Sequence, residues 1–172
     1  MRKLLPILLL GIILLGCEQG LQPVAGFQGT VTLPSDSSGV VIWPDSLEGA
    51  VVTFAATRSL DPKNLSFQQI IQNFLGFSQP LDTTRHTQEY FLQALPTPYS
   101  YVAGVVATTV PITQLLGQPV DSLSAHPEYF KVLGLYGYKP NSLVPFGLIN
   151  VKEGEVTENI NFDTDYDFEV EF

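Results

Sequence analysis

The chain has 172 residues, with 8 Lys and Arg against 17 Asp and Glu, one Cys and a formal net charge of -9. This length allows one domain of ordinary size. The 45% hydrophobic content excludes a disordered acidic tail, the negative charge excludes the basic face that nucleic-acid binding needs, and the single Cys excludes a disulfide framework or four-Cys zinc site.

The first sixteen residues carry the pattern of a secretory signal peptide. Arg2 and Lys3 form a positively charged start, and residues 4–16 are an almost wholly apolar run of 13 residues. A membrane-spanning helix needs about 20 apolar residues, so this run is too short to remain in the bilayer as a spanning helix. We therefore predict that residues 1–16 are a signal peptide that is removed from the mature protein.

The apolar run ends in Leu14, Leu15, Gly16 and Cys17, which resembles the bacterial lipobox. The resemblance implies that the Cys17 thiol is lipidated and that two or three acyl chains, such as palmitate, anchor the protein in the cell envelope. Since Glu18 rather than Asp follows, the implied membrane is the outer membrane if the source is a Gram-negative bacterium. The alternative is a soluble secreted protein with an incidental Cys. We favour the anchor because the only Cys stands at the lipobox position.

After the anchor, residues 17–25 are expected to form a short polar tether. The frequent prolines beyond it favour short strands joined by turns. Alternation of apolar and polar residues, and runs rich in β-branched residues, indicate where the strands lie. The predicted strands span residues 26–33, 48–57, 86–94, 99–109 and 155–162, with a shorter one at 144–151.

One helix is predicted, starting at a cap on Asn64 or Ser66 and ending at Gly76, because apolar residues recur between them at helical spacing. A helix of about ten residues is not stable alone, so its apolar face must lie on another apolar surface. The plain interpretation is a plug at one end of the sheets. The alternative is a mobile lid or a partner helix over a ligand site.

The order of predicted elements resembles the transthyretin-like, or carboxypeptidase-regulatory-like, β-sandwich of bacterial secreted lipoproteins. The pieces that carry it are a G-x-x-G-x-V strand at 26–31, a strand opening at 49–52, a turn after Leu95 and Pro96 leading into 99–102, and a closing strand after Gly154. The resemblance implies a single antiparallel immunoglobulin-like sandwich over residues 26–172, with one short helix in an insertion. Insertions are expected near 58–85 and 111–145.

The C-terminal segment 163–172 is acidic. Asp163, Asp165 and Asp167 resemble the start of a calcium loop, but Phe168 stands where such a loop needs Gly, which excludes an EF-hand. A looser surface site for a divalent cation remains open. Acidic and apolar residues alternate here, which predicts an acidic C-terminal strand or tail. As an edge strand, its apolar side would cover the sandwich and its carboxylates would oppose edge-to-edge association.

No catalytic residue, cofactor site or metal ligand set is predicted. His86 and His126 have neither a second His nor a Cys at ligand spacing, so both are expected in turns or at the surface. Tyr129, Tyr136 and Tyr138 are the candidate ligand contacts, because aromatic side chains on glycine-flanked loops can stack on a sugar ring or meet a protein. The alternative is that they fill the interior of an ordered loop.

The expected function is therefore that of a non-catalytic interaction or structural module, held in the cell envelope by its N-terminal lipid. Its expected partners are the membrane, through the anchor, and a protein or glycan that the sequence does not identify. The alternative function is ligand binding, for example of a glycan, by the loop aromatics. Neither interpretation includes nucleic acid, since the net charge is negative.

Overall fold

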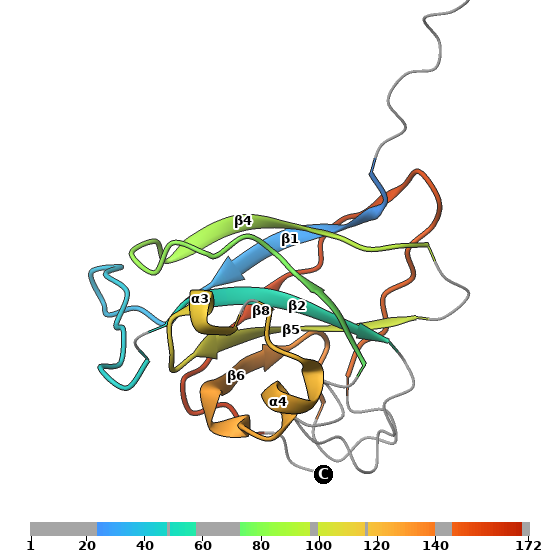
Figure 1. Ribbon diagram of the computed structural model, residues 1–172. Coiled ribbons are helices and arrows are strands. Elements are labelled where there is room, and N and C mark those ends of the chain that lie inside the picture. The colour runs from blue at the N-terminus through green and yellow to red at the C-terminus, as the bar shows by residue number, and fades with distance from the viewer. Residues whose placement is uncertain are drawn as a thin grey trace, which may run out of the picture.

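The protein folds around two β-sheets in a computed structural model that describes residues 24–47, 49–57, 73–96, 100–115, 117–139 and 146–169 (Figure 1). The elements in chain order are β1 (Gly26–Thr32), β2 (Val51–Thr57), β3 (Phe74–Phe77), β4 (Thr87–Gln93), β5 (Tyr101–Thr108), α3 (Ile112–Leu115), α4 (Val120–Ser124), the 3-10 helix η1 (Pro127–Tyr129), β6 (Phe130–Leu135), β7 (Val156–Thr157) and β8 (Phe162–Asp163). No helix in this described part of the chain is long and apolar enough to span a membrane.

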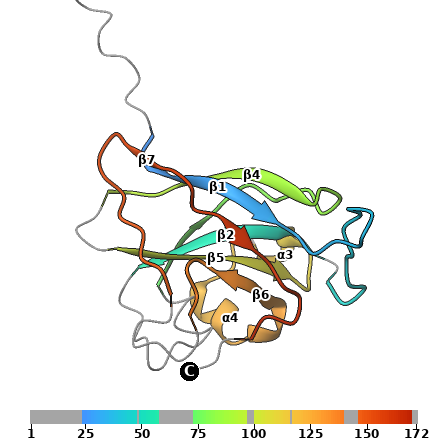
Figure 2. The same ribbon diagram turned by 180° about the vertical axis from the view of Figure 1, so that it is seen from behind.

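The first sheet is built around β1. This strand pairs antiparallel with β4, in a register that runs from Gly26 opposite Gln93 to Thr32 opposite Thr87. On its other side β1 pairs with the short strands β7 and β8, both of them parallel to it (Figure 2). Because apolar and polar residues alternate along β1 and β4, one face of this sheet is buried and the other is not.

The second sheet has the strand order β3-β2-β5-β6, and all its neighbouring strands run antiparallel. Every residue of β5 and the residues 51–56 of β2 are buried. Strands this apolar have no polar face and need cover on both sides. Gly104 keeps the sheet tightly packed, since a Cβ atom there would lie 2.7 Å from both the Gly134 carbonyl oxygen and the Phe54 ring.

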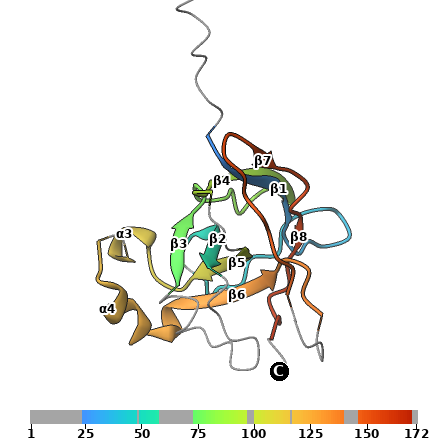
Figure 3. The ribbon, with the colours of Figure 1, turned by 90° about the vertical axis from the view of Figure 1, so that its right-hand side faces the viewer.

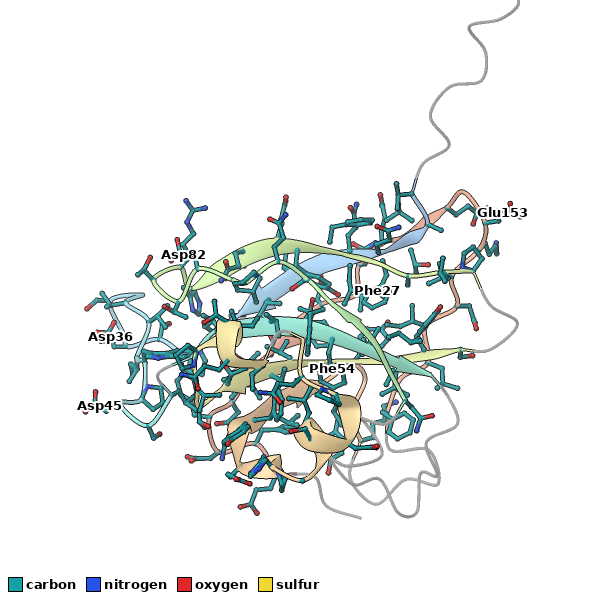
Figure 4. The ribbon with its side chains drawn as sticks, in the orientation of Figure 1. Phe27, Asp36, Asp45, Phe54, Asp82 and Glu153 are labelled. Carbon is teal, nitrogen blue, oxygen red and sulfur yellow. The ribbon has the colours of Figure 1, made fainter. Side chains whose placement is uncertain are left out.

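Apolar side chains cover both faces of the second sheet. One cluster lies between the sheets and includes Phe27, and the other lies beyond the second sheet and includes Phe54 (Figure 4). Leu115, Leu123 and Phe146, from the chain after β5, close the second cluster. Figure 3 shows α3 and α4 on that side of the molecule, away from β4 and β1. The outward side chains of β4, by contrast, are exposed.

Four of the predicted strands are confirmed, since β1, β2, β4 and β5 lie within the expected segments. The prediction of a mainly β fold with two sheets is confirmed as well. The prediction of a wholly antiparallel sandwich is wrong, because β7 and β8 run parallel to β1. A parallel pair needs a long connection, and here β1 and β7 are separated along the chain by the segments that contain β2 to β6.

The helix predicted to end at Gly76 lies mostly outside the described residues, but its end is wrong. Phe74–Phe77 is β3, which pairs antiparallel with β2. A short apolar run fits a helix or a strand equally well by periodicity alone. The segment forms a strand because it can pair with the edge of β2, and the sequence pattern does not reveal that edge.

The segment predicted as an insertion near 111–145 contains regular structure. It contains α3, α4 and η1, and it supplies β6, which pairs with β5 in the second sheet. The short strand predicted at 144–151 is wrong in the part that the structure describes, where Ile149 forms only an isolated bridge with Tyr101. The helices of this segment were not predicted either, and they provide the outer cover that the wholly buried β5 requires.

After β8, the described chain contains no further strand, so the edge strand predicted for 163–172 is wrong in that part. A turn replaces it, in which the Asp165 carboxylate accepts the backbone N–H of Asp167 at 2.9 Å. The aromatic residues of the turn nevertheless cover the sandwich. Tyr166, for example, packs edge-on against Trp43, with ring centroids 5.8 Å apart.

Candidate functional site

The outer face of the first sheet carries the candidate site. Gln28 and Thr30 of β1 lie beside Glu89 and Phe91 of β4 on this face. The flanking residues of β4, such as Leu92, point into the core instead, as alternation along a strand requires. Phe91 breaks the expected pattern because it is a large apolar side chain that is 41% exposed on the polar side of its strand.

A break between β7 and β8 hollows this face. Over residues 158–161 the chain leaves the parallel ladder, and Asn159 there has a φ of 63°, the only positive value at a non-glycine residue among those described. Opposite the break stands Gly29, where an added Cβ atom would overlap the carbonyl group of Ile160. The strand predicted at 155–162 is therefore wrong as one continuous strand, because this close approach replaces regular pairing.

Side-chain hydrogen bonds hold the broken segment against β1. The Asn161 amide oxygen accepts from the backbone N–H of Thr30 at 3.0 Å and from its hydroxyl at 3.1 Å. The Ile160 N–H donates to the Gln28 carbonyl at 3.1 Å. The Gln28 amide also donates to Glu158 at 3.4 Å. Asn161 thus replaces a backbone acceptor at the break, so the hollow is a hydrogen-bonded part of the fold.

Tyr90 fixes the floor of this hollow from within the core. Its hydroxyl donates to the Ile160 carbonyl at 2.8 Å, and its ring packs against Phe27 and Phe162. Burial raises the pKa of the Tyr90 phenol far above its usual range. Tyr90 is therefore a neutral hydrogen-bond donor with a structural role and is unsuited to proton transfer near neutral pH.

The resulting outer-face hollow has a volume of about 460 Å³. Its lining consists of Gln28, Gly29, Thr30, Glu89, Tyr90, Phe91, Glu158, Asn159 and Asn161. Two carboxylates, three amides and one exposed aromatic ring can supply hydrogen bonds and an apolar contact, but the lining contains no Lys, Arg, Ser, Cys or His. The hollow is chemically suited to binding a neutral or cationic group. Its one aliphatic hydroxyl, that of Thr30, donates a hydrogen bond to Asn161.

A second hollow, the edge hollow, runs along the other side of β4. It has a volume of about 470 Å³ and is lined by residues of β4 and of the chain from Phe77 to Leu81. β4 ends the first sheet and β3 ends the second, and Figure 3 shows these two strands. Residues 77–81 line one wall, and Gln88, Glu89, Tyr90, Phe91 and Gln93 line the other. Glu89, Tyr90 and Phe91 belong to both hollows, so one short stretch of β4 borders a face and an edge at once.

The three tyrosines predicted as ligand contacts are all partly buried, and each has a different neighbour. Tyr129 stacks on His126 with ring centroids 4.7 Å apart. Tyr136 packs on Phe162 between the sheets, and Tyr138 packs edge-on against Phe168. The structure does not bring them to either hollow beside β4. Their contacts match the alternative in which they fill ordered loops.

The two histidines lie at the surface, as predicted. His126 Nδ1 lies 2.8 Å from a Glu128 carboxylate oxygen, and this hydrogen bond holds the pKa of Glu128 below its usual range. His86 Nδ1 lies 2.7 Å from the Leu33 carbonyl oxygen. Over the described residues, no group of three His, Cys, Asp or Glu side chains is placed to hold a metal ion. The carboxylates of residues 163–167 form no such group either.

The residues that matter most in the β4 region were not proposed as contacts from the sequence. The exposure of Phe91 could have been predicted from the sequence, because the adjacent side chains Tyr90 and Phe91 of one strand cannot both face the core. The role of Asn161 could not have been predicted from the sequence, since it depends on Gly29, which lies more than a hundred positions earlier in the chain. Comparisons of the chain with protein-family models, with curated proteins and with solved structures found no match.

Proposed function

We propose that this protein is a lipid-anchored module of the bacterial cell envelope that binds a partner and catalyses no reaction. The observation that carries the binding role is the contrast between the two sheets. The second sheet is covered on both faces, whereas the first exposes Phe91 and the outer-face hollow. An exposed aromatic residue beside a recess is typical of interaction surfaces.

The proposed anchor rests on the sequence before β1. Cys17 is the only Cys, and it follows a signal-peptide pattern at the lipobox position. Seven residues further along, the described chain begins at Val24, so a lipid on Cys17 would hold this end within about 25 Å of the bilayer. Val24 and Leu95 are 51% and 73% exposed at this end of the molecule. Exposed apolar side chains there are compatible with a nearby membrane surface. If the source is Gram-negative, we propose the outer membrane.

The finer fold that we propose is the transthyretin-like sandwich that the sequence resembles. Support comes from the strands β1, β2 and β7, which begin within or beside the segments that carry the resemblance. The strand order β4-β1-β7, with β1 and β2 in different sheets, differs from that of a constant-type immunoglobulin domain, so the proposal rests on these segments alone. The resemblance implies a non-catalytic module, in agreement with the proposed binding role.

The anchor is tested by growing cells with a palmitate analogue that carries a detectable tag. We expect the wild-type protein to take up the label and to require detergent for extraction, whereas the Cys17→Ser variant takes up none. A second variant, with a cleavable secretory signal that lacks a lipobox placed before Glu18, should appear in the soluble fraction. Label on Cys17→Ser, or detergent-dependent extraction of the second variant, would contradict the anchor.

The binding role is tested with a photo-crosslinking amino acid at position 91 on the open face. The matched position is Gln114, an exposed residue on the covered side of the molecule. We expect adducts in intact cells from position 91 and none from position 114. Equal labelling from both positions would mean that the open face of the first sheet is not the binding surface.

A second candidate function is the binding of a saccharide in the outer-face hollow. It is favoured by the combination of the Phe91 ring, which can stack on a sugar, with the Gln28 and Asn161 amides, which can bind hydroxyl groups. Saccharide titration followed by amide NMR tests it. Shifts should concentrate on β1 and β4 and vanish in Phe91→Ala, while Tyr138→Ala should retain them. Shifts around Tyr138 instead would contradict binding in the outer-face hollow and would indicate binding by the loop aromatics.

A further inference from the structure

Strand β4 ends the first sheet, and its free edge can be assigned residue by residue. The Leu33 N–H donates to the His86 carbonyl at 2.7 Å, and the Ala94 N–H donates to Ala25 at 3.1 Å. Both hydrogen bonds join the β4 segment to the β1 segment. Since alternate residues of an antiparallel strand direct their N–H and C=O groups to opposite sides, the even-numbered residues of β4 face β1. The odd-numbered ones therefore face away from the sheet: Thr87, Glu89, Phe91 and Gln93.

These four residues present a row of backbone donors and acceptors to the edge hollow. Their side chains are all exposed, and no hydrogen bond from these outward backbone groups to another described residue is found. The residues from 87 to 93 form one unbroken ladder without a bulge or proline. The usual devices that protect an edge strand are thus reduced to one charged side chain, that of Glu89.

The other sheet edges in the described part of the chain are protected. β3 has four residues, and its pairing with β2 is interrupted by a register shift. β6 is covered where the Asp165 N–H donates to the Leu133 carbonyl at 2.9 Å. β7 and β8 have two residues each. Among the described strands, β4 alone offers a long and regular edge.

An open hollow borders β4 beside the edge of the second sheet. Phe77, at the end of β3, and Pro80 and Leu81, which follow it, line this hollow opposite β4. An extended chain paired with β4 would direct alternate side chains toward this apolar wall and the others toward Phe91 on the outer face. Strand addition of this kind takes its affinity from main-chain hydrogen bonds and its specificity from such pockets.

We propose that an extended peptide segment of a partner protein, neutral or basic in character, adds to the free edge of β4 as a further strand. This inference rests on the proposed binding role and specifies the kind of partner that is bound. Glu89 is the only charged residue that lines the edge hollow, and the chain carries a net charge of -9. A basic segment is therefore attracted, whereas a second copy of this chain meets like charge, including Glu89 against Glu89 in a pairing centred there.

The probe is a fluorescent peptide of about nine residues in which threonine and valine alternate between lysine ends, matched to the length of β4. A second peptide has the same side chains but N-methylated backbone nitrogens on alternate residues, and a third has glutamate ends. Binding to the detergent-solubilised full protein is followed by anisotropy. We expect saturable binding of the lysine peptide, at least about tenfold weaker binding of the N-methylated one, and weaker binding of the glutamate one.

Two variants at one position separate main-chain pairing from side-chain contact. Glu89→Pro removes an N–H that points away from β1, so it blocks strand addition while leaving the β1–β4 ladder in place. Glu89→Gln removes the charge and keeps the N–H. We expect Glu89→Pro to weaken binding of the lysine peptide at least about tenfold, and Glu89→Gln to keep binding of the lysine peptide while narrowing its advantage over the glutamate peptide. Protection of the Phe27 and Val31 amides from hydrogen exchange verifies that both variants are folded.

Three results would overturn the inference. They are no saturable binding of the lysine peptide up to about 1 mM, equal binding of the N-methylated peptide, and unchanged binding by folded Glu89→Pro. A concentration-dependent dimer that Glu89→Pro abolishes would assign the edge to a second copy instead. The palmitate label on Cys17 tests the lipid anchor separately from the peptide assay. A protein that takes up the label but does not bind the peptide would contradict the proposed partner and leave the proposed location in place.

Discussion

Gly29 illustrates how a single residue shapes the outer face of the first sheet. A side chain at this position would overlap the backbone of Ile160, so glycine is needed for the close approach that forms the break between β7 and β8. Because a backbone group is in the way, relief requires movement of residues 158–161 rather than a change of rotamer.

We therefore predict that Gly29→Ala lowers the free energy of unfolding by about 1–3 kcal/mol, as overpacking does in other proteins. Gly76→Ala is the matched control, since Gly76 is also in a strand but a Cβ atom there meets nothing within 4 Å. Urea denaturation of both variants measures the difference. Equal stabilities would mean that Gly29 has no packing role.

Tyr90 supports a prediction on alkaline pH. Burial raises the pKa of its phenol above the ordinary value near 10, so the folded state holds this proton more tightly than the unfolded chain does. The stability that this difference contributes is complete below about pH 10 and is lost as the pH rises above that value.

We expect Tyr90→Phe to cost about 1–2 kcal/mol at neutral pH, because the hydrogen bond to Ile160 is lost. The variant should also lose less stability than the wild type between pH 10 and pH 11, which denaturation curves at each pH will measure. Tyr129→Phe, in which Tyr90 remains, should keep the wild-type fall. A steep fall in Tyr90→Phe equal to that of the wild type would contradict this role.

At the scale of elements, the strands that the sequence predicts well are those whose pattern is local. The alternation in β1 and the apolar run in β2 mark buried faces that each strand carries in its own residues. The elements that were missed depend on distant partners. β3 needs the edge of β2, so no periodicity in its own segment specifies it. The alternation at 155–162 does predict a strand where β7 lies, but the break between β7 and β8 depends on Gly29 of β1.

The same distinction applies to the candidate site. Tyr129, Tyr136 and Tyr138 stand out in the sequence because aromatic and glycine residues cluster there, but each packs against a different ring. The edge of β4 has no sequence signature, since it depends on which strand ends the sheet. Strand order is a property of the whole chain, which explains why composition and spacing did not indicate this edge.

The break beside β1 gives a prediction at this scale. Asn161 accepts two hydrogen bonds from Thr30, so Asn161→Ala should cost about 1 kcal/mol and speed hydrogen exchange of the Thr30 amide. Asn161→Asp keeps an acceptor oxygen in place and should retain slow exchange. If Asn161→Ala leaves the Thr30 amide protected, the side chain does not hold the broken segment.

For the whole molecule, charge and cover divide the surface into distinct regions. The chain after β5 covers the second sheet, the first sheet remains open, and the N-terminal end lies beside Glu153 at one end of the sandwich (Figure 4). Removal of Arg2 and Lys3 with the predicted signal peptide changes the formal net charge from -9 to -11. Such a charge repels anionic surfaces.

We expect residues 18–172, expressed without the lipid, not to sediment with vesicles of anionic lipid, because the proposed attachment is through acyl chains alone. The control is the lipidated protein, which should sediment with neutral and anionic vesicles alike. Sedimentation of the lipid-free protein would show that the folded domain itself contacts the bilayer, which would contradict attachment through acyl chains alone.

The most direct test of the proposed membrane-anchored module is the intact mass of the protein extracted from its native membrane. The prediction is a chain that begins at Cys17 and carries the added mass of a diacylglycerol group and its acyl chains. A chain with an unmodified Cys17, whether or not residues 1–16 remain, would contradict the anchor and with it the proposed location.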